Sequence, residues 1–119
     1  MIKMNIIPFS QFTNIHQSAT INAGVEGRVF YFQIPKSMVG FMNKIGNNYF
    51  TGTILKLFID GELIEDNIKR IIAMIDQPQE YNPPYLVKNS IEVRCTNNDT
   101  SAHTLEVLVD GVLIQKNGD

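Results

Sequence analysis

The sequence predicts an all-β protein, a single β-sandwich with at most one short helix. Hydrophobic and polar residues alternate over several short segments, and turn-forming residues recur about every 8–12 positions. A chain of 119 residues, 44% of them hydrophobic, has the size of one domain that can bury its own core. We therefore treat residues 1–119 as one domain. About seven short strands fit jelly-roll and immunoglobulin-like connectivities equally, so both stay open.

The first strand with a clear period lies in the segment GRVFYFQIP. Phe30, Phe32 and Ile34 share one face, while Val29, Tyr31 and Gln33 share the other. Because both faces are largely apolar, the segment predicts a central strand.

The segment SIEVRCTNND has the clearest alternation in the chain. Ile91, Val93 and Cys95 point to one side, and the residues between them are charged or polar. This pattern is typical of a sheet with one buried and one solvated face.

Two segments fifty positions apart resemble each other. Residues 47–67 and 97–117 are identical at eight of 21 aligned positions, including Asp60-Gly61 and Asp110-Gly111. Each Asp-Gly pair predicts a tight hairpin turn after a strand. The repeat indicates either two equivalent units in two packed sheets or the repeated use of common turn residues.

The segment DNIKRIIAMIDQP favours no single structure. Its isoleucines from Ile68 to Ile75 have helical spacing, but isoleucine at this density also favours a strand. The following DQPQEYNPPYL contains Pro78, Pro83 and Pro84, which predicts a surface crossover or a sheet edge.

Charge and composition exclude several classes of function. The net charge is −2 and the basic residues are scattered, so we expect no nucleic-acid partner. No apolar run reaches the length of a membrane span, so we expect no membrane association. The N-terminus lacks a signal-peptide pattern, so we expect the protein to be made in the cytoplasm. The single cysteine also favours a reducing compartment.

No motif in the sequence predicts catalysis. Cys95 alternates with apolar residues, which favours packing over nucleophilic chemistry, and His16 and His103 have no metal-binding companions. The acidic residues around Asp60 fit a solvated hairpin tip rather than a calcium loop. We expect no enzyme, no metal and no cofactor.

Two groups of residues are candidates for binding. Apolar residues crowd an irregular-looking segment between glycines, which either covers a sheet edge or contacts a partner. Aromatic residues near Asn and Pro either plug the ends of the sandwich or form a platform for a sugar. The partner-binding candidates are Met38, Val39, Phe41 and Met42, and the glycan-binding candidates are Tyr49, Phe50, Tyr81 and Tyr85.

The C-terminal third carries a resemblance to a known class. The residues that carry it are Pro83-Pro84, Lys88-Asn89 before the strand over 91–96, the Asn97-Asn98 turn, and Glu106-Val107 before Asp110-Gly111. In these the chain resembles small β-sandwich proteins of tailed bacteriophage virions, of the capsid-decorating or head-fibre type. The resemblance implies a non-enzymatic virion component, assembled in the host cytoplasm, that binds copies of itself or other virion proteins.

Overall fold

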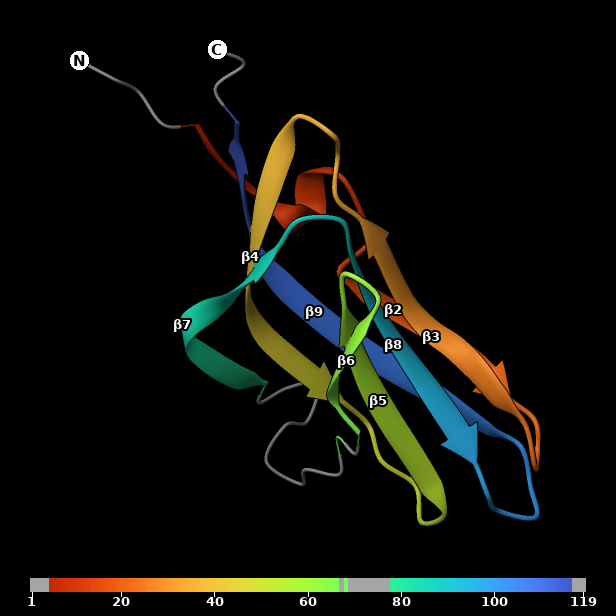
Figure 1. Ribbon diagram of the computed structural model, residues 1–119. Coiled ribbons are helices and arrows are strands. Elements are labelled where there is room, and N and C mark those ends of the chain that lie inside the picture. Colours follow the sequence, from red (N-terminus) through yellow and green to blue (C-terminus); the bar gives the residue numbers. More distant parts are fainter. Residues whose placement is uncertain (1–4, 67, 69–77, 117–119) are drawn as a thin grey trace.

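The computed structural model describes residues 5–66, 68 and 78–116. Within them the chain forms nine strands, one 3₁₀ turn and no α-helix (Figure 1), which confirms the all-β class. The elements are β1 (Ile6–Pro8), η1 (Phe9–Gln11), β2 (His16–Ile21), β3 (Glu26–Gln33), β4 (Met38–Asn47), β5 (Thr53–Ile59), β6 (Glu62–Glu65), β7 (Gln79–Val87), β8 (Ser90–Asn97) and β9 (His103–Gln115).

The strands form two antiparallel sheets packed as a sandwich. In sheet A, β9 pairs with β1 and β2 along one edge and with β4 along the other, and β4 also pairs with β7. Sheet B has the order β3-β8-β5-β6. The pairs β2–β9, β3–β8, β4–β7 and β5–β6 are those of one long ribbon folded back at its middle, and β4–β9 and β5–β8 form when that ribbon is rolled up. This winding is a jelly roll, so the topology decides between the two predicted connectivities.

Alternation decides which side chains enter the core between the sheets. In β8 the side chains of Ile91, Val93 and Cys95 are fully buried, as the sequence predicted. In the neighbouring β5, Leu55 and Leu57 are buried in the same way, and Lys56 between them points to the partly exposed outer face. The core is therefore one continuous layer built from every second residue of the central strands.

Strand β3 lies at the edge of sheet B, so the prediction of a central strand is wrong. A register shift between Arg28 and Phe30 turns both Val29 and Phe30 into the core. Most of the apolar residues that suggested two buried faces therefore share one face. Tyr31 stays on the outer face, where the Arg28 guanidinium stacks 4.2 Å from the centre of its ring.

The internal repeat corresponds to two equivalent crossings between the sheets. After Asn47 the chain passes from β4 in sheet A to β5 in sheet B, and after Asn97 it passes from β8 in sheet B to β9 in sheet A. Both asparagines are buried. The two crossings lie against each other, because the Asn98 N–H donates to the Gly52 carbonyl at 2.8 Å. The equivalence ends before the two Asp-Gly pairs.

At Asp60-Gly61 the predicted hairpin is confirmed. Both residues have positive φ, 55° and 82°, as a tight turn between β5 and β6 requires. The Asp60 carboxylate also accepts hydrogen bonds from the backbone N–H groups of Lys88, Asn89 and Ser90, at 3.1, 2.6 and 3.1 Å. One side chain thus ties the β5–β6 turn to the β7–β8 turn.

At Asp110-Gly111 the predicted hairpin is wrong. Strand β9 runs unbroken from His103 to Gln115 and pairs with β4 on both sides of this dipeptide. Gly111 is needed for close packing instead: a Cβ there would overlap the Phe41 carbonyl oxygen and lie 2.8 Å from two ring carbons of Phe9. Phe9, on η1, fills the gap that β1 and β2 leave along β9, and its ring requires a glycine beneath it.

Strand β7 is the outermost strand of sheet A, which confirms the predicted sheet edge for this proline-containing segment. The helix-or-strand question for Ile68–Ile75 falls on residues 69–77, which lie outside the described residues. Ile68 itself is buried, and its N–H donates to the Leu55 carbonyl at 2.7 Å.

Candidate functional site

The outer face of sheet A carries a band of apolar side chains at one end. The strand register places Pro8, Val112, Phe41 and Leu86 side by side across four strands, and Ile6, Ile114 and Val39 side by side in the next outward-facing row. We call these seven residues the apolar band: Ile6, Pro8, Val39, Phe41, Leu86, Val112 and Ile114. Ile6 is 58% exposed and Leu86 is 48% exposed, so the band is open to solvent.

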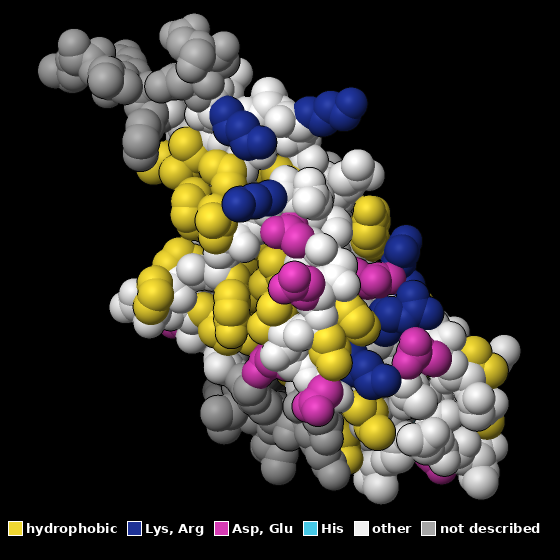
Figure 2. All heavy atoms as spheres, viewed as in Figure 1, with side chains coloured by type: hydrophobic (Ala, Val, Ile, Leu, Met, Phe, Trp, Pro, Cys, Tyr) yellow, Lys and Arg dark blue, Asp and Glu magenta, His cyan; other side chains and the backbone are white. Residues whose placement is uncertain are grey.

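Figure 2 views the molecule from the outer face of sheet B, and hydrophobic side chains show along the edge where β4 and β7 lie in Figure 1. Lys and Arg side chains lie next to them at the upper end of this view.

The structure separates the four predicted partner-binding residues into two pairs. Residues 38–42 belong to β4, so the interpretation as an irregular apolar segment is wrong. Met38 and Met42 point into the core, with exposures of 8% and 0%, because alternation along β4 turns them inward. Val39 and Phe41 point outward and remain candidates, as members of the apolar band.

Sequence reasoning missed the other five members of the band. Val112 and Ile114 were assigned to the return strand of a hairpin that does not exist, and Ile6, Pro8 and Leu86 lie far from them in the sequence. The usable signal was alternation after Gly111, where Val112 and Ile114 flank the buried Leu113. Only the strand pairing shows that these segments share one face.

The apolar band ends at a charged row. Asp110, Lys44 and Glu80 lie side by side on β9, β4 and β7, directly next to the row that contains Phe41. Beyond the other end of the band are the exposed residues Lys88, directly after β7, and Lys116, directly after β9. The face is thus apolar in its middle, with two acids and one base on one side and lysines on the other.

The four candidate aromatic residues do not form one platform. Tyr81 and Tyr85 are together on β7, with ring centres 5.0 Å apart in an edge-to-face arrangement. Phe50 lies in the crossing after β4, where its ring stacks on His103 at 4.4 Å. Tyr49 precedes Phe50 in that crossing. The four aromatic residues therefore lie at two separate places, Tyr81 and Tyr85 on β7 and Tyr49 and Phe50 after β4.

Within the Tyr81–Tyr85 pair, exposure differs. The Tyr81 hydroxyl donates to a Glu65 carboxylate oxygen at 3.0 Å, and its ring packs against the core. Tyr85 is 36% exposed. Opposite this pair, Asn43 is the extra residue of a bulge in β4, and its buried Oδ1 has no hydrogen-bond partner within the described part of the chain.

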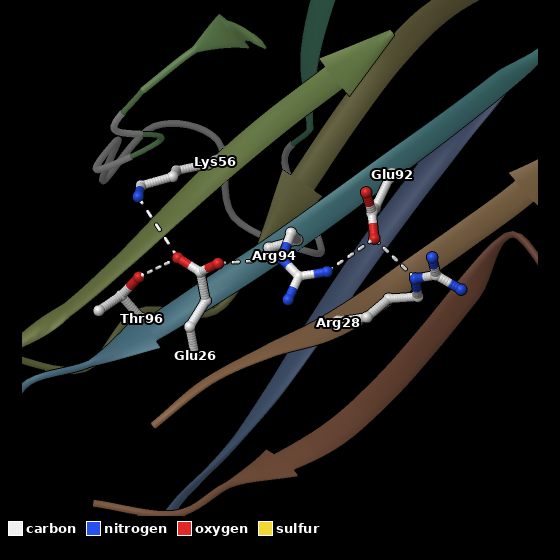
Figure 3. Close-up of polar contacts among 6 residues, drawn as sticks. All are labelled: Glu26, Arg28, Lys56, Glu92, Arg94 and Thr96. Carbon is white, nitrogen blue, oxygen red and sulfur yellow. Dashed lines mark hydrogen bonds and ion pairs between the residues drawn. The ribbon is translucent and has the colours of Figure 1, made fainter. Parts of the chain in front are cut away.

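The outer face of sheet B is built differently, as a ladder of paired charges (Figure 3). The Arg94 guanidinium lies between two carboxylates, with its Nε 3.1 Å from Glu26 and one terminal nitrogen 3.1 Å from Glu92. Arg28 binds Glu92 at 2.7 Å, and Lys56 lies 3.4 Å from Glu26.

The ladder lowers the pKa of Glu26, first through the Thr96 hydroxyl, which donates at 2.7 Å, and then through Arg94. It also raises the pKa of Arg94, mainly through Glu26. All three cations of the ladder are paired with carboxylates, so the ladder is a poor surface for binding a phosphate backbone.

Cys95 is buried between the sheets, as predicted. Loss of hydration on burial raises the pKa of its thiol to about 11, so the thiolate needed for nucleophilic chemistry is scarce at neutral pH. His16 binds Glu106 and His103 binds Asp99, at 3.0 and 2.7 Å. Among the described residues no three His, Cys, Asp or Glu side chains are grouped to hold a metal ion.

Comparison of the chain with protein-family models, with curated proteins and with solved structures found no match. In the described residues no helix has the length and apolar character needed to cross a membrane.

Proposed function

We propose that this protein is a non-enzymatic assembly module whose apolar band contacts a protein surface, either a second copy or another component of a particle. The single observation that carries the proposal is that seven apolar residues from four strands lie together on one outer sheet face. A jelly roll forms viral capsid domains and lectin domains alike, so the fold does not choose between these functions and the surface must.

The size of the band sets the strength of such a contact. Strands about 4.8 Å apart and outward-facing rows about 7 Å apart give a band of about 200–300 Å². A stable interface buries about 800 Å² on each partner, so the band is the apolar centre of a larger contact or part of a weak one. Weak contacts suffice where many copies bind together, because the avidity of a multivalent assembly exceeds each single affinity.

The virion context of the proposal comes from the sequence resemblance over the C-terminal third. A phage component of this kind is made in the host cytoplasm and is held in a symmetric particle by repeated contacts. In this setting the protein works by holding neighbours in place and needs no catalytic group.

The test uses substitutions on the two outer faces. Phe41→Asp places a charge in the centre of the band. Leu86→Asp places a charge at the edge of the band, on the outermost strand, where the more exposed side chain makes the risk to folding lower. Phe58→Asp is the matched control, because Phe58 is a partly exposed outward residue of a central strand of sheet B. We expect the two band variants, and not the control, to lose self-association in sedimentation velocity and capture of virion proteins from a phage-infected lysate.

Unchanged association in both folded band variants would refute the proposal. Thermal unfolding of each variant shows whether it is folded, and Leu86→Asp keeps the test valid if Phe41→Asp unfolds.

A second candidate function, glycan binding, is favoured by one specific observation. The exposed Tyr85 ring lies beside Tyr81 and pairs in register with Met42, next to Asn43, whose buried Oδ1 has no hydrogen-bond partner among the described residues; an apolar ring and a hydrogen-bond acceptor thus lie on the same part of the β4–β7 edge. Sugars bind to such combinations. Binding on a glycan array that Tyr85→Ala removes and Tyr49→Ala leaves intact would support it, and a silent array would exclude it.

A further inference from the structure

The charges around the apolar band are arranged differently at its two ends. The outward residues of β9 run in the order Asp110, Val112 and Ile114, and the exposed Lys116 follows directly after the strand, so the buried Leu113 lies in the middle of this series. An acid and a base thus lie at equal distances, three residues each way, from Leu113. Lys116 keeps its position because its backbone N–H donates to the Ser37 carbonyl at 2.7 Å.

We propose that two copies of this chain pack sheet A against sheet A, about a two-fold axis that runs between the sheets, across the strands, at Leu113. Sheets that pack face to face keep their strands within about 30° of one another, which such an axis allows. The inference deepens the proposed function, on which it rests, by naming a second copy as the occupant of the apolar band.

This axis pairs each position on β9 with the position equally far on the other side of Leu113 in the second copy. Val112 then lies against Ile114 of the second copy, and Asp110 lies against Lys116 of the second copy. By symmetry the Asp110–Lys116 contact occurs twice.

The same axis crosses β4 at Gly40 and β7 at Val87, their register positions beside Leu113. It therefore places Val39 against Phe41 of the second copy. On β7 it places the aliphatic stem of Lys88 over Leu86 of the second copy, with the ammonium group free to reach water.

Charge complementarity selects a second copy over an unrelated occupant. An apolar surface alone would accept many partners, but this face carries its own complement: the acid at one end matches the base at the other after a half-turn. The opposite two-fold axis, parallel to the strands, keeps each row on its own level, so it stacks the row of Asp110, Lys44 and Glu80 on the same row of the second copy and brings no Asp110–Lys116 contact.

Reciprocal charge reversal tests the arrangement. In Lys116→Asp each dimer contact becomes Asp opposite Asp, and in Asp110→Lys it becomes Lys opposite Lys, so we expect each variant alone to dimerise at least about fivefold more weakly than wild type. A mixture of the two variants restores both contacts, because one chain then carries an acid at both positions and the other carries a base at both. Ser18→Lys, an exposed change at the polar end of the same face, is the control and leaves dimerisation unchanged.

The measurement is sedimentation velocity from about 1 to about 500 µM at low ionic strength, where charge pairs are least screened. Two fluorophores distinguish the mixed dimer from the two homodimers. Preferential formation of the mixed dimer supports this geometry, because a loss of stability in either variant would not be repaired by mixing.

Three results would overturn the inference: wild type that stays monomeric over the whole range, single variants that dimerise as wild type does, or a mixture that associates no better than its components. Each of these results can be told apart from a failure of the proposed assembly function. If the chain is monomeric but Phe41→Asp still removes capture of a virion protein, the apolar band binds that protein and the two-fold arrangement alone is wrong.

Discussion

The position of Gly111 offers the sharpest test of the fold, because the hairpin expected from the sequence and the continuous strand in the structure predict opposite results. Gly111→Ala adds one methyl group beneath the Phe9 ring and against the Phe41 carbonyl. Gly111→Asn adds a larger side chain at the same point. In a hairpin turn Asn is the best replacement for a glycine with positive φ, whereas in a packed strand it is worse than Ala.

The expected magnitude follows from the contacts. Overpacking a close-packed core costs about 1–3 kcal/mol, and contact with a backbone oxygen inside the sheet places Gly111→Ala near the upper limit. The reduced entropy of the unfolded chain offsets about 0.4–1 kcal/mol, so we expect a net loss of about 2–3 kcal/mol for Ala and about 4 kcal/mol or more for Asn. These losses are a large part of the roughly 5–15 kcal/mol that stabilises a domain.

Gly61 is the matched control. Its φ is 82° and a Cβ there would meet nothing within 4 Å, so only backbone strain opposes substitution. We expect Gly61→Ala to cost about 1–2 kcal/mol and Gly61→Asn to cost less, because Asn tolerates the left-handed conformation.

The assay is urea unfolding followed by far-ultraviolet circular dichroism for wild type and the four variants. The decisive quantity is the order of the Ala and Asn midpoints at each position. If Gly111→Asn unfolds at the wild-type midpoint, or if Asn is milder than Ala at both positions, the packing argument is refuted.

Three further predictions test other parts of the molecule. Asn97→Ala removes a buried amide that makes three hydrogen bonds, so it should destabilise the fold by about 1–3 kcal/mol in urea unfolding, clearly more than Asn47→Ala, whose buried Oδ1 has no partner among the described residues. Hydrogen bonding to His103, then to the backbone, lowers the pKa of Asp99, so its contribution to stability is present above the ordinary pKa of 3.8 and is lost as the pH falls through the lowered value. Wild type should therefore be more stable than Asp99→Asn at about pH 6, and the difference should shrink as the pH falls below 3.8 and disappear once Asp99 is protonated in the folded protein, in parallel urea titrations. A difference that does not shrink in acid would contradict the assignment. Cys95 should resist iodoacetamide in the folded protein and react once urea unfolds it, and rapid labelling without unfolding would show that the thiol is accessible.

Local pattern was sufficient for the fold class and for one turn. Period-two alternation in β8 predicted its buried face, because successive side chains of a strand must point to opposite sides. The Asp60-Gly61 hairpin was also predictable, since a two-residue turn with positive φ at both positions depends mainly on those residues. The burial of Cys95 followed from the same alternation.

The candidate site could be predicted only in part. Val39 and Phe41 were found because they lie in an apolar segment, but Met38 and Met42 in the same segment are buried. Composition marks a segment as apolar and does not give the direction of its side chains. The aromatic candidates failed for a similar reason: Tyr81 and Tyr85 meet on one strand, while Phe50 stacks on His103 in a crossing.

By itself the sequence determined the β class and the alternation that builds the core, because these depend on residues that are neighbours along the chain. Only the tertiary structure decided that Asp110-Gly111 continues a strand, since the Phe9 ring beneath Gly111 comes from a segment about a hundred residues away. The apolar band likewise exists only where β1, β9, β4 and β7 pair. Strand register, which sets both features, is fixed by contacts between distant parts of the chain and leaves little trace in any one segment.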